Sequence, residues 1–132
     1  MSHFLQELPS PLLLAYLGDS VMEVLVRSLL IARPGVTPAQ CNREALAFIT
    51  AANQAQAAKR VQPFLTPEEQ ELFTRAKNAK SNSNPRNVSL FTYCLATAYE
   101  ALFGFHALRQ EPQRNRQLLA LGYPEAFPEE EM

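Results

Sequence analysis

Two acidic side chains stand out because each is isolated in an apolar or basic segment. Asp19 is the only aspartate among the thirteen acidic residues of the chain, and it interrupts the apolar run 12–21. Glu100 is the only acid in residues 72–104. Carboxylate oxygens bind hard cations, and Mg²⁺ is held in proteins through one or two carboxylates while its waters face a phosphate substrate. The pair therefore predicts a divalent-cation site, provided that the two residues meet in the fold.

A plainer interpretation is that each acid is solvated, or is half of an ion pair, on a helix surface; composition alone favours this reading, and spacing does not decide the matter. Glu23 follows Asp19 by four residues, so the two share a helix face. A like-charged pair at this spacing costs an isolated helix roughly 0.2–0.5 kcal/mol. A bound cation or a nearby arginine would offset that cost.

A basic segment spans residues 75–87, with four cations, four asparagines and no acid. Its composition is typical of a loop that contacts a nucleic-acid backbone, because lysine and arginine neutralise phosphates and asparagine hydrogen-bonds them. The candidate RNA-binding residues are Arg75, Lys77, Asn78, Lys80 and Arg86. The alternative is a solvated helix end whose cations favour the helix dipole. That alternative accounts for the residues before 81 but not for Arg86 or the asparagines.

The elements that would position these residues are helices. Ser10-Pro11, Thr37-Pro38 and Thr66-Pro67 each place a capping hydroxyl before a proline suited to the first helical position. The expected helices are 11–32, 38–61, 67–80, 87–109 and 112–121. No segment alternates with β-branched enrichment, so we expect an all-α domain, with Asp19 on the first helix and Glu100 on the fourth.

The fourth expected helix has an apolar stripe at spacings of three and four, which predicts its core face. The stripe comprises Phe91, Cys94, Leu95, Ala98, Leu102, Phe105 and Leu108. The second expected helix is rich in alanine, which permits close approach of its neighbours, and no chemistry is assigned to it. His106 is expected to cap or decorate the end of its helix rather than bind a metal.

Length and composition bound the remaining possibilities. A chain of 132 residues with 47% hydrophobic residues predicts one globular domain, 1–132. The net charge of −1 conceals a body of +3 in residues 1–124, because an acidic tail, expected to be flexible, occupies 125–132. We expect a reduced, cytoplasmic protein without a signal peptide or membrane span. A glycine-rich phosphate loop is absent, which argues against the usual nucleotide-binding enzymes.

Two motifs together resemble a known family. Residues 14–21 (LAYLGDSV) resemble the nine-residue motif of ribonuclease III catalytic domains, and residues 99–104 (YEALFG) resemble their second acidic motif. The segment 75–81 (RAKNAKS) is similar to the basic loop of the short bacterial mini form, which lacks the double-stranded-RNA-binding domain. The resemblance covers residues 12–109 and implies the compact helical ribonuclease III-type fold.

The resemblance implies roles for individual residues. Asp19 and Glu100 match the metal-binding catalytic acids, with Mg²⁺ as the cofactor and Mn²⁺ as a substitute, and Glu23 matches a supporting or outer-sphere acid of the mini form. Ala15 and Thr97 stand where full-length enzymes have two further acids, a departure shared with the mini form. Tyr16 falls where the family places a dimer-contact residue, which implies a homodimer.

The implied function is a metal-dependent endoribonuclease that cleaves double-stranded RNA and matures the ends of the large-subunit ribosomal RNA precursor. The alternative is a non-catalytic scaffold dimer that kept the fold and binds double-stranded RNA, which the missing acids at Ala15 and Thr97 would suit. Retention of both Asp19 and Glu100 favours the enzyme. A scaffold gains nothing evident from unpaired acids facing RNA phosphates.

Overall fold

The computed structural model describes residues 8–79 and 88–127, and these residues form helices and no strand. The elements are α2 (Pro11–Leu30), α3 (Pro38–Ile49), α4 (Ala51–Val61), the 3₁₀ turn η1 (Gln62–Phe64), α5 (Pro67–Lys77), α6 (Leu90–Leu108) and α7 (Pro112–Gly122). The predicted all-α class is confirmed. Within the described ranges, no helix is both long enough and apolar enough to cross a membrane.

The helices α2, α3 and α5 begin where the sequence predicts, whereas the helix expected from residue 87 begins at Leu90. Ser10 accepts a hydrogen bond from the backbone N–H of Leu13 and starts α2. Thr37 and Thr66 form capping boxes with residues three positions later, and a proline follows each cap. These local signals set the direction in which each helix enters the fold.

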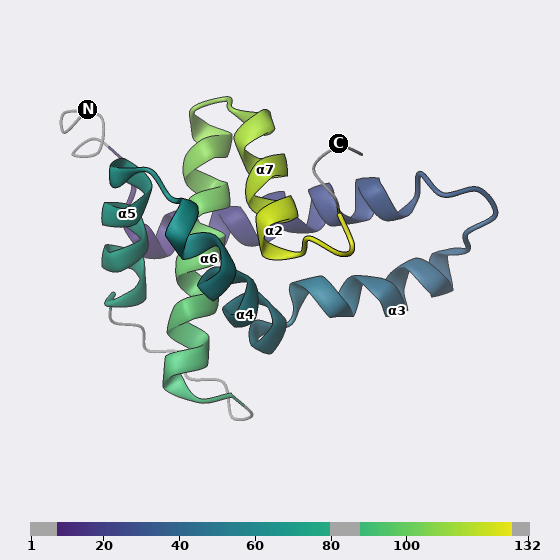
Figure 1. Cartoon of the computed structure of the whole chain (residues 1–132), viewed down its shortest axis with the longest axis horizontal. Helices are drawn as coiled ribbons and strands as arrows, with labels where there is room; N and C mark the ends of the chain where they lie inside the picture. The colour runs from purple at the N-terminus through teal and green to yellow at the C-terminus, as the bar shows by residue number, and fades with distance from the viewer. Residues whose placement is uncertain (1–7, 80–87, 128–132) are drawn as a thin grey trace.

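The prediction of a single helix over 38–61 is wrong, because the helix is interrupted at Thr50. Its backbone is extended, with φ −80° and ψ 150°, and it ends α3 and precedes α4. The Asn53 side chain donates a hydrogen bond of 2.9 Å to Thr50 Oγ1 and supports the break. As a result, α3 pairs with α2 in an arm that extends from the body, while α4 turns to pack across α6 (Figure 1).

The centre of the molecule is α6, against which α2, α4, α5 and α7 all pack (Figure 1). The middle of its predicted core stripe is buried, including Leu95, Leu102 and Phe105. The two ends of that stripe are not core, since Phe91 and Leu108 are 62% and 47% exposed. The core prediction therefore fails where α6 extends past the helices that cover it.

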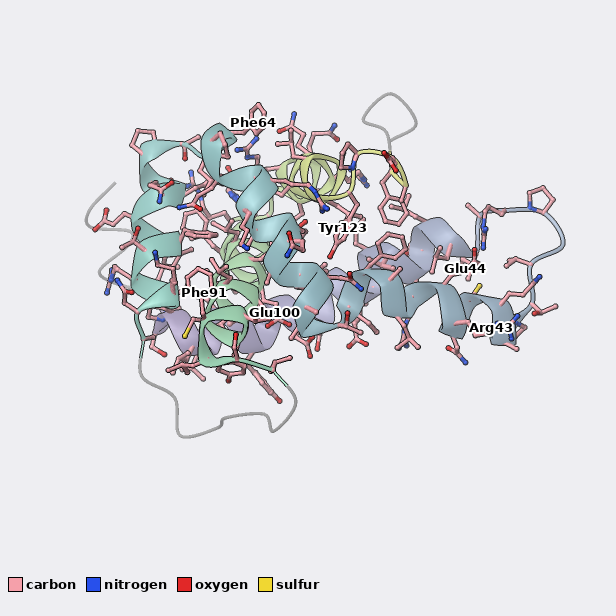
Figure 2. All side chains as sticks on the ribbon, turned by 60° about the horizontal axis from the view of Figure 1, so that its bottom comes forward. Arg43, Glu44, Phe64, Phe91, Glu100 and Tyr123 are labelled. Atoms are coloured by element: carbon pink, nitrogen blue, oxygen red, sulfur yellow. The ribbon has the colours of Figure 1, made fainter. Side chains whose placement is uncertain are left out.

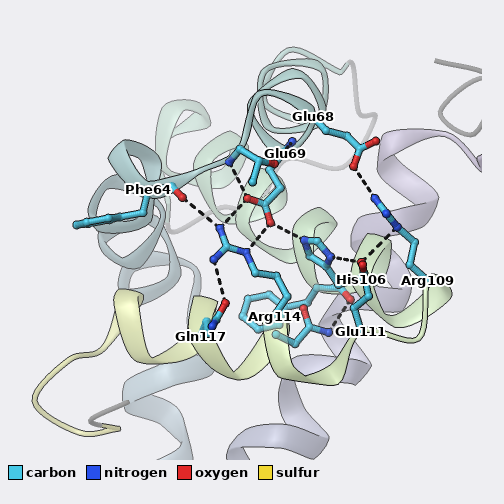
Figure 3. A network of polar contacts seen from close by, with 11 residues as sticks. Phe64, Glu68, Glu69, His106, Arg109, Glu111, Arg114 and Gln117 are labelled. Atoms are coloured by element: carbon cyan, nitrogen blue, oxygen red, sulfur yellow. Dashed lines mark hydrogen bonds and ion pairs between the residues drawn. The ribbon is translucent and has the colours of Figure 1, made fainter. Parts of the chain in front are cut away.

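A buried ionic network joins α5, α6 and α7 (Figure 3). Arg114 donates hydrogen bonds of 2.8 and 2.7 Å to the two carboxylate oxygens of Glu69. His106 lies between two acids, with Nε2 2.6 Å from Glu69 Oε2 and Nδ1 2.9 Å from Glu111 Oε1. Burial alone would raise the pKa of Glu69, but the hydrogen bonds from Arg114 and His106 hold that pKa well below its usual range. The expected decorative role of His106 is thus wrong, because its side chain is a buried crosslink.

The helices α2 and α6 cross with their backbones in close contact at Gly18 and Gly104. A Cβ at Gly18 would lie 1.7 Å from the backbone oxygen of Glu100, and one at Gly104 would lie 2.0 Å from the backbone oxygen of Leu14. Real Cβ atoms are excluded at such distances, so both positions require glycine. The crossing brings the backbones of the two motif-bearing helices into direct contact.

Gly18→Ala should therefore destabilise the protein by about 3 kcal/mol or more, because the added methyl must separate two packed backbones. Denaturant unfolding at fixed protein concentration measures the change. Ser20→Ala, at an exposed position of the same helix, is the matched control and should change stability by no more than about 0.5 kcal/mol. Equal stability of the two variants would show that the crossing is looser than described.

Candidate active site

Asp19 and Glu100 meet at the crossing of α2 and α6. Asp19 follows Gly18 directly and is exposed, while Glu100 lies one helical turn before Gly104 and is partly buried. Their side chains share a hydrogen bond. Glu100 lies where α6 meets α2 and α4 (Figure 2). The structure thus brings together the two acids that the sequence singles out.

The environment of Glu100 opposes its ionisation. Burial, the hydrogen bond to Asp19 and the charge of Asp19 together raise the pKa of Glu100 from its ordinary value of 4.5 to about 9, and the charge of Glu23 adds to the rise. A hydrogen bond from Gln54 acts in the opposite direction. Without a cation, Glu100 therefore carries a proton at neutral pH.

Two further side chains lie close to Glu100. Glu23 accepts a hydrogen bond of 3.3 Å from Arg27, so an arginine offsets the like charges on this face of α2. Gln54, on α4, is buried and reaches Glu100. Sequence reasoning missed Gln54, because its direction depends on the break at Thr50. A glutamine among the alanines of this segment was the signal that the sequence offered.

The positions of the two missing acids are closed to the site. Ala15 and Thr97 are both buried. The Thr97 hydroxyl donates a hydrogen bond of 2.9 Å to the backbone oxygen of Tyr93 in the preceding turn. Neither residue supplies a carboxylate, and no group of three His, Cys, Asp or Glu side chains in the described ranges could hold a metal ion.

The donors that are present fit a weakly held Mg²⁺ or Mn²⁺. Two carboxylates on packed helices supply hard oxygen atoms, and Mg²⁺ needs no more than one or two of them because it keeps several waters. In the absence of a cation, the raised pKa of Glu100 keeps a proton on this carboxyl and so limits its repulsion with Asp19. A divalent cation would neutralise the same charge, so the pair suits one.

The structure places the other predicted site residues apart from this pair. Arg75, Lys77 and Asn78 occupy the C-terminal end of α5, where Arg75 and Asn78 are exposed. Lys80 and Arg86 lie outside the described residues. The described basic positions lie at the end of α5, whereas the side chains that shape the environment of Glu100 come from α2 and α4.

One exposed face of α2 carries several large apolar side chains, with the polar residues Ser20 and Arg27 between them. Tyr16, the predicted dimer contact, is 80% exposed. Leu13, Val24 and Ile31 are also exposed and lie on the same side of the helix at spacings of three, eight and seven. We call these four residues the α2 stripe. Exposed apolar patches are typical of surfaces that associate with a partner.

Comparison with known proteins decides the family. The sequence model of the Ribonuclease III domain matches residues 12–111. The chain belongs to the ribonuclease III family. It is therefore a ribonuclease III-type endonuclease, as the motifs 14–21 and 99–104 predict, and the matched range agrees with the predicted 12–109.

Relatives in the family are of similar size. The chain is 34% identical over 112 residues to the Mini-ribonuclease 3 of Thermoanaerobacter sp. (strain X514), covering 85% of this chain and 79% of that one. It is 37% identical over 112 residues to the Mini-ribonuclease 3 of Brevibacillus brevis, covering 85% and 84%. A crystal structure of a Fusobacterium nucleatum protein matches with a TM-score of 0.79 and 27% identity, covering 87% of this chain and 93% of that one.

The pKa of Glu100 predicts a pH-dependent stability in the presence of chelator. The unfolded carboxyl ionises near 4.5 and the folded one near 9, so the folded ribonuclease binds more protons between these values and loses stability as pH rises. Glu100→Gln removes this loss and should be more stable than the parent at pH 8 by on the order of 2 kcal/mol, with the difference vanishing toward pH 4. Denaturant unfolding across this range tests it.

The control for this measurement is Glu71→Gln, at an exposed position on α5, which should keep the slope of the parent. A slope unchanged by Glu100→Gln would contradict the assigned environment of this carboxyl.

Proposed function

We propose that this chain is a Mg²⁺-dependent endoribonuclease that cleaves double-stranded RNA as a homodimer. The observation that carries the proposal is the direct contact of Asp19 and Glu100 at the glycine crossing. The family supplies the reaction class, phosphodiester hydrolysis. The contact supplies a place where two acids hold one cation.

Each acid has a distinct part in this site. Asp19 is exposed and can meet both the cation and the substrate, whereas Glu100 is set deeper and must release its proton before it binds metal. A bound divalent cation would activate water and stabilise the charge that develops on the phosphate. Glu23 stays bound to Arg27 and acts on the site through its charge. No side-chain nucleophile is required.

A homodimer follows from the substrate and from the α2 stripe. One small domain with one site cuts a single strand, so cleavage of both strands of a duplex needs two copies. The α2 stripe, with Tyr16, gives each copy an apolar surface that a second copy would cover. A two-fold interface uses the same patch on both copies, and a helix stripe meets that requirement.

Binding of duplex RNA is assigned to the basic segment. Arg75, Lys77 and Asn78 project from the end of α5, and Lys80 and Arg86 follow in the chain. A-form RNA is recognised mainly through its phosphates and 2′-hydroxyls, which suits cations and amides without a base-reading motif. The body of the protein, without the acidic tail, has the positive charge that such a partner needs.

The natural substrate that the family resemblance supports is the precursor of the large-subunit ribosomal RNA, whose ends the enzyme would mature in the cytoplasm. The chain has no feature of its own that selects this RNA. The proposal of that substrate rests on the similarity to the mini form.

Asp19→Asn tests the activity. The variant keeps the size of the side chain and loses the negative charge, so cleavage of a defined RNA duplex with Mg²⁺ should fall by more than about 100-fold, since even partners that only orient a ligand are worth 10–100-fold. The helical circular-dichroism signal and the mass in solution should stay unchanged. Single-stranded RNA and chelator serve as negative controls for the parent.

Parent-like cleavage by Asp19→Asn would refute the assignment. Duplex binding by the parent without products in Mg²⁺ or Mn²⁺, at any enzyme concentration, would instead establish the scaffold alternative.

Tyr16→Glu tests the dimer. Burying a charge in an apolar interface is unfavourable, and a two-fold interface carries the substitution twice, so the dimer Kd should rise by about 100-fold. Sedimentation velocity at several concentrations measures it. Leu46→Glu is the matched control, because Leu46 is an exposed apolar residue on α3 outside the α2 stripe, and it should remain a dimer. Equal association of both variants would remove the α2 stripe from the interface.

A further inference from the structure

Gln54 is a buried polar side chain at the junction of α2, α4 and α6. Only 3% of its surface is exposed. Its Nε2 donates to Met22 Sδ at 3.5 Å, and its side chain lies close enough to Glu100 to lower the pKa of that carboxyl. A thioether sulfur is a weak acceptor, so its hydrogen bond does not offset the free-energy cost of removing a carboxamide from water. The partner that explains a polar residue at this position is therefore Glu100.

The fold is built to let Gln54 reach Glu100. The break at Thr50 starts α4 in a new direction, and Gln54 lies in its first turn. The buried neighbours Ala55, Ala57 and Ala58 keep α4 close to α6. A glutamine spans the remaining gap, and its burial restricts the rotamers from which it can donate. A shorter side chain at this position would hold its amide farther from Glu100.

The chemistry of an amide suits this position. A lysine or arginine in contact with Glu100 would neutralise the charge that a cation requires. A carboxamide N–H instead fixes the orientation of a carboxylate oxygen and leaves the net charge of the acid pair unchanged. Hydrogen bonds of this kind orient metal-binding carboxylates, and their loss costs about 10–100-fold in metal affinity or activity.

We propose that Gln54 is a positioning residue of the active site, whose carboxamide holds the Glu100 carboxylate in the orientation that binds a divalent cation together with Asp19. This inference rests on the proposed function. It adds a third helix, α4, to a site that the sequence motifs confine to α2 and α6. It also gives a two-acid site a means of fixing its ligands that needs no further carboxylate.

The test is Gln54→Met, which keeps the length and approximate volume of the side chain, packs beside Met22 and removes the donor. Mn²⁺ binding to the RNA-free protein, followed by electron paramagnetic resonance, should weaken by about 10–100-fold, and the Mg²⁺ concentration that half-saturates cleavage should rise by a similar factor. Excess Mg²⁺ should restore much of kcat. The melting temperature and the mass in solution report on the fold separately.

Gln56→Met is the matched control, because Gln56 is exposed on the same helix, and it should bind Mn²⁺ as the parent does. If Gln54→Met fails to fold, Gln54→Asn takes its place, since it keeps the amide but shortens its reach and should show the same loss.

The outcomes separate the two proposals. If Asp19→Asn loses Mn²⁺ binding while the folded Gln54 variant keeps the affinity and Mg²⁺ dependence of the parent, Gln54 only packs and the positioning role is refuted. If Asp19→Asn also binds Mn²⁺ and cleaves like the parent, the proposed function itself fails. Loss of metal affinity in both variants, with Gln56→Met unchanged, supports both.

Discussion

The site depends on one steric constraint, the contact between the backbones of α2 and α6. Packed helices are usually held about 8–10 Å apart, axis to axis, by the side chains between them. At this crossing there is no room even for a Cβ, since one at Gly18 would lie 1.7 Å from the Glu100 backbone oxygen. The residues beside the contact, Asp19 and Glu100, have little room to separate. Pairing of the acids is thus a consequence of where the two glycines lie, and a larger residue at either glycine would move the acids apart.

That pairing has an electrostatic cost, which defines what the site can do. Two carboxyl groups in contact, one of them partly buried, do not both ionise readily, and the raised pKa of Glu100 expresses this. A divalent cation would remove this cost by replacing the proton, so metal binding at the pair would be coupled to proton release. Ala15 and Thr97 are buried and carry no charge. A single proton therefore relieves the charge repulsion within the acid pair.

Local signals predicted much of this arrangement, and tertiary packing decided the rest. The caps at Ser10, Thr37 and Thr66 predicted the starts of three helices, and the two motifs singled out the two acids that the fold brings together. The break at Thr50 has no proline or glycine to mark it, so periodicity alone joined α3 to α4. The sequence therefore did not reveal that Gln54 lies next to Glu100. The path of α4, which brings the two residues together, depends on packing against helices distant in sequence. His106 was misjudged for the same reason, because its partner Glu69 lies 37 residues away.

The helix α2 carries both the proposed catalytic acid Asp19 and the proposed dimer surface, on different faces. Gly18 faces α6, Asp19 faces the site, and Tyr16 lies on the exposed stripe, all within four residues. Any shift of α2 against α6 therefore moves both the acid pair and the proposed interface. Conversely, a second copy packed on the α2 stripe would press α2 toward α6 and favour the close crossing. The buried network of Glu69, His106 and Arg114 holds α6 from the opposite side. The acid pair thus lies between the buried ionic network on one side and the α2 stripe, the proposed dimer surface, on the other.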